Sequence, residues 1–141
     1  MDDTTSALQR GVPSVSESNA ARLVAKLLAS GELKPSFLMR TLHQGQIDSF
    51  EHGFAALLGI ETEQLRRILY FEKPTVAALA CRGVGIDRSA FLTVFGLSRH
   101  KRQRPFTLNE VDRTETDRVF ATVAKAEAMA RIQDLVTKAA S

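Results

Sequence analysis

The sequence contains no tryptophan, one tyrosine and one cysteine. With so few large aromatic rings, it offers few platforms on which a base or a sugar can stack. The single cysteine, Cys81, excludes an internal disulfide framework and fits a reducing compartment, so we expect a cytoplasmic protein. No apolar run approaches the roughly 18 residues that a membrane-spanning helix needs, and the first residues are acidic and polar rather than a secretion signal. We therefore expect no membrane partner.

The common motifs of catalysis are also missing. There is no G-x-x-x-x-G-K phosphate loop, no G-x-S-x-G nucleophile motif and no H-E-x-x-H zinc motif. His43 and His52 are nine positions apart on different predicted helices, which is not the spacing of a metal pair. Cys81 lies near a helix end whose dipole disfavours a thiolate, so a small buried hydrophobe is the simpler interpretation. We therefore expect no enzyme, with no catalytic residues, no metal and no cofactor.

The chain does contain a short sequence motif that begins with glycine and occurs four times. Each copy ends one apolar pattern of helical period and begins the next, which is typical of stacked helical repeats. We therefore predict an all-α fold, with six short antiparallel helices stacked as HEAT-like helical hairpins plus one long C-terminal helix. The four copies are Gly31-Glu32-Leu33, Gly45-Gln46-Ile47, Gly59-Ile60 and Gly85-Ile86.

Composition and capping residues divide the chain into four segments. Ser16 and Asp48 are expected to cap helices, the latter in a capping box with Glu51. Pro35 and Pro74 are expected to begin two others, because proline needs no hydrogen bond in the first turn. The predicted segments are a flexible N-terminal tail at 1–15, a helical-repeat domain at 16–98, a basic linker at 99–106 and a long C-terminal helix at 107–141. The residues expected to be buried are Leu23, Leu27, Leu38, Leu42, Phe54, Leu57, Leu65, Ile68, Leu79, Phe91 and Phe95.

The long C-terminal helix is the first candidate for an interaction site. Its apolar side chains need cover over a length that the short helices only partly span, and a large exposed apolar surface commonly marks a binding site. We therefore predict that it projects and pairs with another chain, most simply its own copy in a homodimer. The alternative is that it folds back and caps the stack. The residues concerned are Val119, Phe120, Val123, Ile132, Leu135 and Val136.

The second candidate is a cluster of four cations, Arg99, Lys101, Arg102 and Arg104. They are four of the 19 basic residues, so 15 remain against 16 acidic ones, and the rest of the chain is not basic. The cluster is a possible site for a polyanion such as nucleic acid or a cyclic dinucleotide, with nucleic acid the less favoured. The alternative is a solvated linker. Arg66 and Arg67, beside Tyr70 and Phe71, are best interpreted as a solvated face with the aromatic rings packed inward.

Part of the chain resembles a known family. The relevant residues run from Leu33-Lys34-Pro35 to Gly45, from Phe50 to Gly59, and over Leu65-Arg66-Arg67-Ile68-Leu69. This pattern resembles the alphaproteobacterial family known as domain of unknown function twenty-three thirty-six, over roughly Ala21 to Leu97. The resemblance implies an all-helical fold with HEAT-like pairs, and it brings no catalytic residues.

These observations favour a non-enzymatic helical scaffold or adaptor that binds another protein, because stacked repeats form extended surfaces. The alternative is a regulatory module that binds a polyanionic ligand through the basic cluster at 99–104. Binding of a polyanion should weaken steeply with added salt, whereas a hydrophobic protein interface should not.

Overall fold

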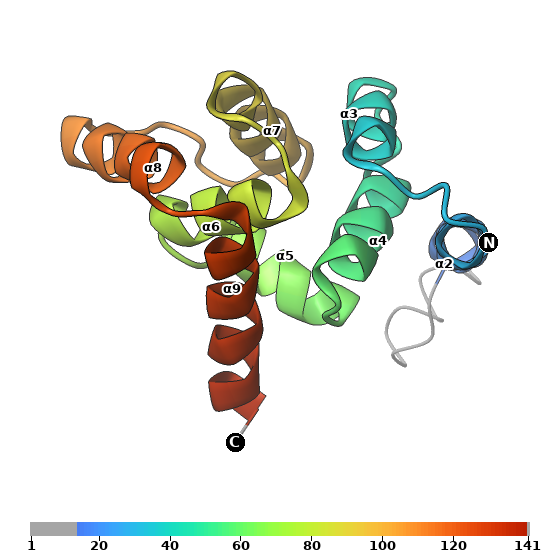
Figure 1. Ribbon diagram of the computed structural model, residues 1–141. Helices are drawn as coiled ribbons and strands as arrows, with labels where there is room; N and C mark the ends of the chain where they lie inside the picture. Colours follow the sequence, from blue (N-terminus) through green and yellow to red (C-terminus); the bar gives the residue numbers. More distant parts are fainter. Residues whose placement is uncertain (1–13, 141) are drawn as a thin grey trace.

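The computed structural model describes residues 14–140, and within them every regular element is an α-helix (Figure 1). An all-α fold is therefore confirmed. Six helices precede residue 102 and two follow it. Their bounds are α2 Val15–Ala29, α3 Pro35–His43, α4 Ile47–Leu58, α5 Thr62–Tyr70, α6 Pro74–Val84, α7 Arg88–Lys101, α8 Glu110–Thr122 and α9 Lys125–Ala140.

The repeated glycines end four of these helices, as predicted. Gly31, Gly45, Gly59 and Gly85 have φ angles of 76°, 75°, 72° and 94°, a left-handed conformation that side chains with a Cβ rarely adopt. In each case the next residue donates its backbone N–H to the carbonyl five positions earlier, as Ile86 does to Cys81 at 2.9 Å. This is the Schellman arrangement, which satisfies carbonyls left free at a helix end.

The predicted helix starts are confirmed in part. Pro35 and Pro74 occupy the first positions of α3 and α6. The cap of α2 is Ser14 rather than Ser16, and its hydroxyl accepts from the N–H of Glu17 at 3.1 Å. The capping box predicted at Asp48 and Glu51 is wrong, because α4 already begins at Ile47 and Glu51 turns inward.

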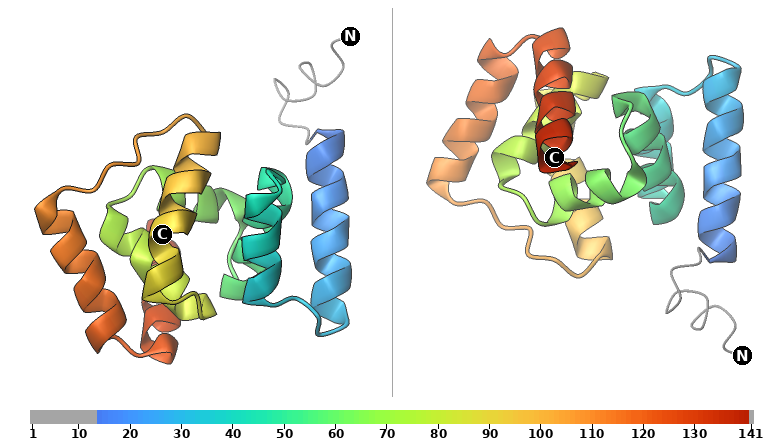
Figure 2. Two further views of the ribbon diagram at one scale, coloured as in Figure 1. Left: turned by 90° about the horizontal axis from the view of Figure 1, so that it is seen from above. Right: turned by 90° about the horizontal axis from the view of Figure 1, so that it is seen from below.

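Two helices, α4 and α6, form the centre of the molecule. α4 contacts α2, α3 and α5, and α6 contacts α7, α8 and α9, while α5 joins the two groups (Figure 2). Phe50 and Phe54 of α4 are fully buried and pack edge to face with ring centroids 5.7 Å apart. Most of the expected core is buried, but Leu23 is 43% exposed, because α2 packs on α4 through Ala20 and Val24 instead.

The prediction of one long C-terminal helix is wrong. The chain leaves the helical conformation at Val123, where φ is −97° and ψ is 124°, so that α8 and α9 are separate helices. The break places the Val123 side chain in the core at 8% exposure, and its carbonyl accepts from Nε of Arg82 at 2.9 Å. Burial of Val123 and this hydrogen bond compensate for the helical bonds that are lost.

The predicted projection of this segment from the body is also wrong. α9 lies along α6 so closely that a Cβ on Gly83 would come within 3.2 Å of the Met129 backbone. Ala128 and Ile132 of α9 are fully buried in this contact. The glycine at position 83 is therefore what allows α9 to cover α6.

The predicted boundaries around the basic linker need correction as well. Arg99 and Lys101 belong to the last turn of α7, and Arg102 is its C-cap, so the connection to α8 begins later than predicted. Of the tail predicted at 1–15, residues 1–13 lie outside the described residues, while Ser14 and Val15 already form the start of α2. Within residues 14–140, no helix is long and apolar enough to cross a membrane.

Candidate functional site

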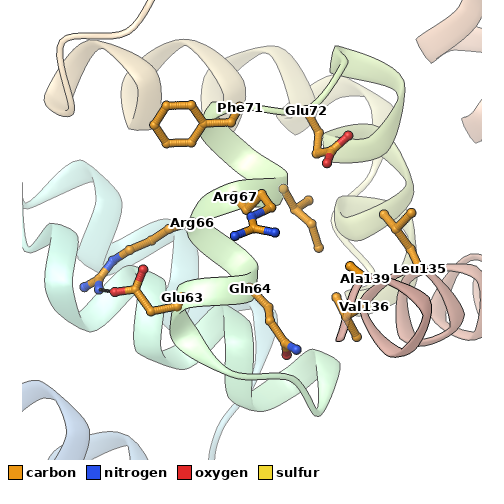
Figure 3. Close-up of a pocket in the computed structure, with 10 residues that line it drawn as sticks. Glu63, Gln64, Arg66, Arg67, Phe71, Glu72, Leu135, Val136 and Ala139 are labelled. Atoms are coloured by element: carbon orange, nitrogen blue, oxygen red, sulfur yellow. Dashed lines mark hydrogen bonds and ion pairs between the residues drawn. The ribbon is translucent and has the colours of Figure 1, made fainter. Parts of the chain in front are cut away.

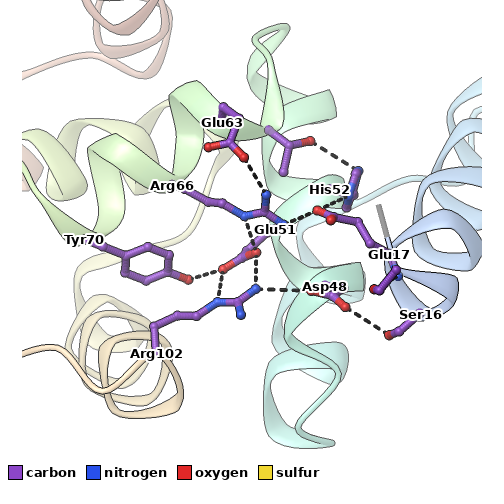
Figure 4. Close-up of polar contacts among 11 residues, drawn as sticks. Ser16, Glu17, Asp48, Glu51, His52, Glu63, Arg66, Tyr70 and Arg102 are labelled. Carbon is purple, nitrogen blue, oxygen red and sulfur yellow. Dashed lines mark hydrogen bonds and ion pairs between the residues drawn. The ribbon is translucent and has the colours of Figure 1, made fainter. Parts of the chain in front are cut away.

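The most unusual polar feature of the fold is the buried carboxylate of Glu51 on α4. Its side chain is fully buried, and both oxygens are occupied (Figure 4). Oε1 accepts from Nε of Arg66 at 2.8 Å and from Nη2 of Arg102 at 2.7 Å. Oε2 accepts from the Tyr70 hydroxyl at 2.6 Å and from Nε of Arg102 at 2.9 Å. Four donors thus satisfy a charge that would otherwise be costly to bury.

The two arginines extend this cluster to the surface. Arg66 also pairs with Glu17 of α2 and with Glu63 of α5. Arg102 also reaches Asp48 at 3.1 Å, and Asp48 accepts from the Ser16 hydroxyl at 2.9 Å. His52 lies 3.2 Å from both Glu17 and the Thr62 hydroxyl. We call this set the Glu51 cluster, and it joins α2, α4, α5 and the end of α7: Ser16, Glu17, Asp48, Glu51, His52, Thr62, Glu63, Arg66, Tyr70 and Arg102.

The electrostatics of the Glu51 cluster are those of a structural site. Burial by itself would raise the pKa of Glu51, but hydrogen bonds from Arg102, Tyr70 and Arg66 outweigh it, and the pKa lies below its ordinary value of 4.5. Burial, followed by the charge of Glu51, raises the pKa of the Tyr70 hydroxyl. Glu51 is therefore held ionised and Tyr70 neutral, so that neither has a proton to exchange near neutral pH.

Three of the four cations in the predicted polyanion site already make hydrogen bonds within the fold. Arg99 is only 9% exposed and donates to the carbonyls of Leu69, Glu72 and Pro105 at 2.8–3.1 Å. Arg104 donates to the Tyr70 carbonyl at 3.2 Å, and its guanidinium lies 4.4 Å from the Phe71 ring centre. Arg102 belongs to the Glu51 cluster. Of the four, only Lys101 makes no side-chain hydrogen bond or ion pair within residues 14–140.

The surroundings of the basic cluster are acidic as well. Arg66 and Arg102 share four carboxylates between them, from Glu17, Asp48, Glu51 and Glu63. A polyanion that approached Arg102 would meet these carboxylates and would have to displace existing partners. Polyanion binding stays a prediction, and Lys101 is the cation best placed to take part.

The remaining candidates for chemistry are dispersed. Cys81 is fully buried and unpaired, and burial raises the pKa of its thiol. His43 is exposed, and His100 packs against the Phe106 ring at 5.8 Å. In the part of the chain that the structure describes, no three His, Cys, Asp or Glu side chains are grouped so as to hold a metal ion.

A groove between α5 and the C-terminal half of α9 is the second feature (Figure 3). Its volume is about 680 Å³, within the range of sites that accept a ligand. Ile68 of α5 and Val136 of α9 form its floor, while Leu135 is 37% exposed and Phe71, at the rim, is 67% exposed. The groove exists because α9 is docked on α6 beside α5. Its lining residues are Glu63, Gln64, Arg66, Arg67, Ile68, Phe71, Glu72, Leu135, Val136 and Ala139.

The structure divides the six residues predicted to form an interaction helix into two groups. Val119, Val123 and Ile132 are buried, and Phe120 packs against Phe91 with ring centroids 5.5 Å apart. Leu135 and Val136, by contrast, line the groove. The outer face of α9 carries the ion pairs Glu127–Arg131 and Asp134–Lys138. A homodimer through this segment stays a prediction, and of the six residues Leu135 and Val136, at the groove, remain for it.

Sequence reasoning missed the roles of Glu51 and Arg66. The sequence predicts Glu51 in a cap, because it follows Asp48 by three positions, and Arg66 on a solvated face. The spacing of Glu51 from Phe50 and Phe54, which places it beside the core stripe of α4, is a pattern that could have indicated burial. Phe71 was expected to pack inward and is exposed instead.

Comparisons with known proteins agree with the resemblance found in the sequence and extend it. A family model described as an uncharacterised protein conserved in bacteria (DUF2336) matches residues 1–133, well beyond the Ala21–Leu97 range inferred from the motifs. No curated protein and no solved structure matches the chain. Because the family model matches nearly the whole sequence, the chain belongs to this bacterial family.

Proposed function

We propose that this protein is a non-enzymatic helical scaffold or adaptor that binds another protein through the groove between α5 and α9. The observation that carries the proposal is the exposed apolar side chains gathered there: Phe71 and Leu135 lie at the edges of a floor formed by Ile68 and Val136. Exposed apolar side chains gathered at one concave place, rather than scattered singly, commonly mark an interaction site. A cytoplasmic location, suggested by the single unpaired cysteine, belongs to the same proposal.

A scaffold function also agrees with how the polar groups are used. Within residues 14–140, every buried side-chain nitrogen and oxygen has a hydrogen-bond partner. The Glu51 cluster therefore supports the arrangement of α2, α4, α5 and α7 and leaves little free capacity for a substrate. The HEAT-like pairing of the helices is part of this proposal. It is supported by the glycine motif that occurs four times and by the packing of α3 on α4.

Site-specific photo-crosslinking in the bacterium that carries the gene tests the proposal. A p-benzoylphenylalanine in place of Ala139 would lie in the groove, whereas the same group in place of Ala130 would lie on the other side of α9, because nine residues correspond to a rotation of about 180°. We expect a discrete adduct from position 139 that Leu135→Asp removes, and none from position 130. Equal labelling from both positions, or no adduct from position 139, would contradict a role for the groove.

A further inference from the structure

The groove between α5 and α9 is lined by two arginines, one of which is paired with carboxylates while the other is not. Arg66, on one side, already faces the carboxylates of Glu17, Glu51 and Glu63. Arg67 is exposed, and within the described residues its side chain makes no hydrogen bond or ion pair, although it reaches over the groove between Gln64 and Phe71 (Figure 3). Glu63, which precedes Arg67 by four positions, pairs with Arg66 instead. Arg67 therefore remains available to a partner's carboxylate.

The surrounding secondary structure restricts how a peptide could bind. Strand addition needs an open sheet edge, and within residues 14–140 there is no strand. A polyproline segment needs a groove lined by several aromatic rings, whereas this lining contains only Phe71. What remains is a helix laid between two helices, with its apolar ridge on Ile68, Leu135 and Val136.

The dimensions of the groove set the length of such a ridge. The α5 wall has nine residues and is roughly 13 Å long at 1.5 Å per residue. About two turns of a partner helix fit beside it, which corresponds to two or three apolar side chains at i, i+4 and i+7. An interface of this size is at the small end for protein complexes, so the contact suits reversible binding.

From the apolar floor, the all-helical walls and the unpaired guanidinium, we infer that the groove receives one amphipathic helix of another protein, and that an acidic residue beside its apolar ridge pairs with Arg67. The inference rests on the function proposed above and adds the chemistry of the partner. Glu72, whose side chain is also without a partner in the described residues, lies at the end of the lining beyond Arg67 and disfavours a second acidic residue there.

The same crosslinking group at position 139 tests the inference when Arg67→Glu is added to it. A like charge in place of an ion pair should reduce the adduct about tenfold. Arg118→Glu is the matched control, because Arg118 is exposed on α8, has no side-chain ion pair in the described residues and changes the net charge equally. It should leave the adduct unchanged. The thermal unfolding of both variants should match that of the unmodified protein.

Digestion and mass spectrometry of the adduct then identify the attached segment. We expect an amphipathic helical segment that contains an acidic residue. Replacement of this acidic residue by lysine should restore the adduct in the Arg67→Glu variant. An adduct that is insensitive to Arg67→Glu, an extended or proline-rich segment, or a linkage to this chain itself would overturn the inference. The first two results would leave the proposed groove function standing. The absence of any adduct from position 139 would overturn that function as well.

Discussion

Replacing Glu51 by alanine should lower the free energy of unfolding by about 3 kcal/mol, the low end for removal of one partner from a buried ion pair. The low end applies because the Arg66 and Arg102 side chains are 20% and 35% exposed, so they keep some contact with solvent, and because both arginines also pair with other carboxylates. The buried Tyr70 hydroxyl would lose its acceptor at the same time. Glu63→Ala is the matched control, since Glu63 pairs with the same Arg66 but is 85% exposed, and it should cost less than about 1 kcal/mol.

The contribution of Glu51 to the free energy of unfolding should also depend on pH and should be lost in acid. Its pKa is lower in the folded chain than the ordinary 4.5, so the unfolded chain binds more protons between these two values. The stabilisation is therefore complete above pH 4.5 and is lost as the pH falls through the folded value. Denaturant unfolding at several pH values should show a steeper acid loss for the unmodified protein than for Glu51→Ala. Equal slopes would mean that Glu51 is not the charge centre of the cluster.

Changing Arg99, Lys101, Arg102 and Arg104 together to alanine should lower the melting temperature by about 10 °C or more, since a loss above about 3 kcal/mol is expected. In a solvated linker, the alternative that the sequence leaves open for this cluster, the same change would leave stability nearly unaffected. The contacts of Arg99 with three carbonyls and of Arg102 with Glu51 account for the difference.

Lys101→Ala is the control for this change, because it removes a cation that holds no partner in the described residues, and it should leave the melting temperature unchanged. If the fourfold variant melts like the unmodified protein, the arginines do not support the fold. Titration with DNA, RNA or a cyclic dinucleotide at low salt then measures any separate affinity. Such affinity should be reduced by Lys101→Ala alone if the cluster acts as a site.

The sequence was a good guide to features that depend on local chemistry. Glycine at a left-handed helix end and proline at a first turn act within a few residues, so Gly59, Gly85, Pro35 and Pro74 were placed correctly. The core stripes of α4 and α5 were also predicted, because a period of 3.6 residues is visible in the chain itself.

The features that could not be predicted depend on contacts between distant segments. Glu51 and Arg102 are 51 positions apart, and nothing local indicates that one neutralises the other. The break at Val123 is favoured only because α6 offers Arg82 and a surface across Gly83 on which α9 packs. A helical pattern therefore identified α8 and α9 as helix but could not say that they turn back.

In the structure α9 is docked along α6 and thereby forms one wall of the groove. Backbone hydrogen exchange tests this docking in the unmodified protein and in the variants Gly83→Leu and Gly96→Leu. A Cβ at Gly83 would meet the Met129 backbone at 3.2 Å, whereas a Cβ at Gly96 would meet nothing within 4 Å. We predict that the amides of α9 are protected as strongly as those of α6 in the unmodified protein and in Gly96→Leu, and that Gly83→Leu abolishes the protection of α9. Rapid exchange throughout α9 in the unmodified protein would contradict the docking of α9 on α6.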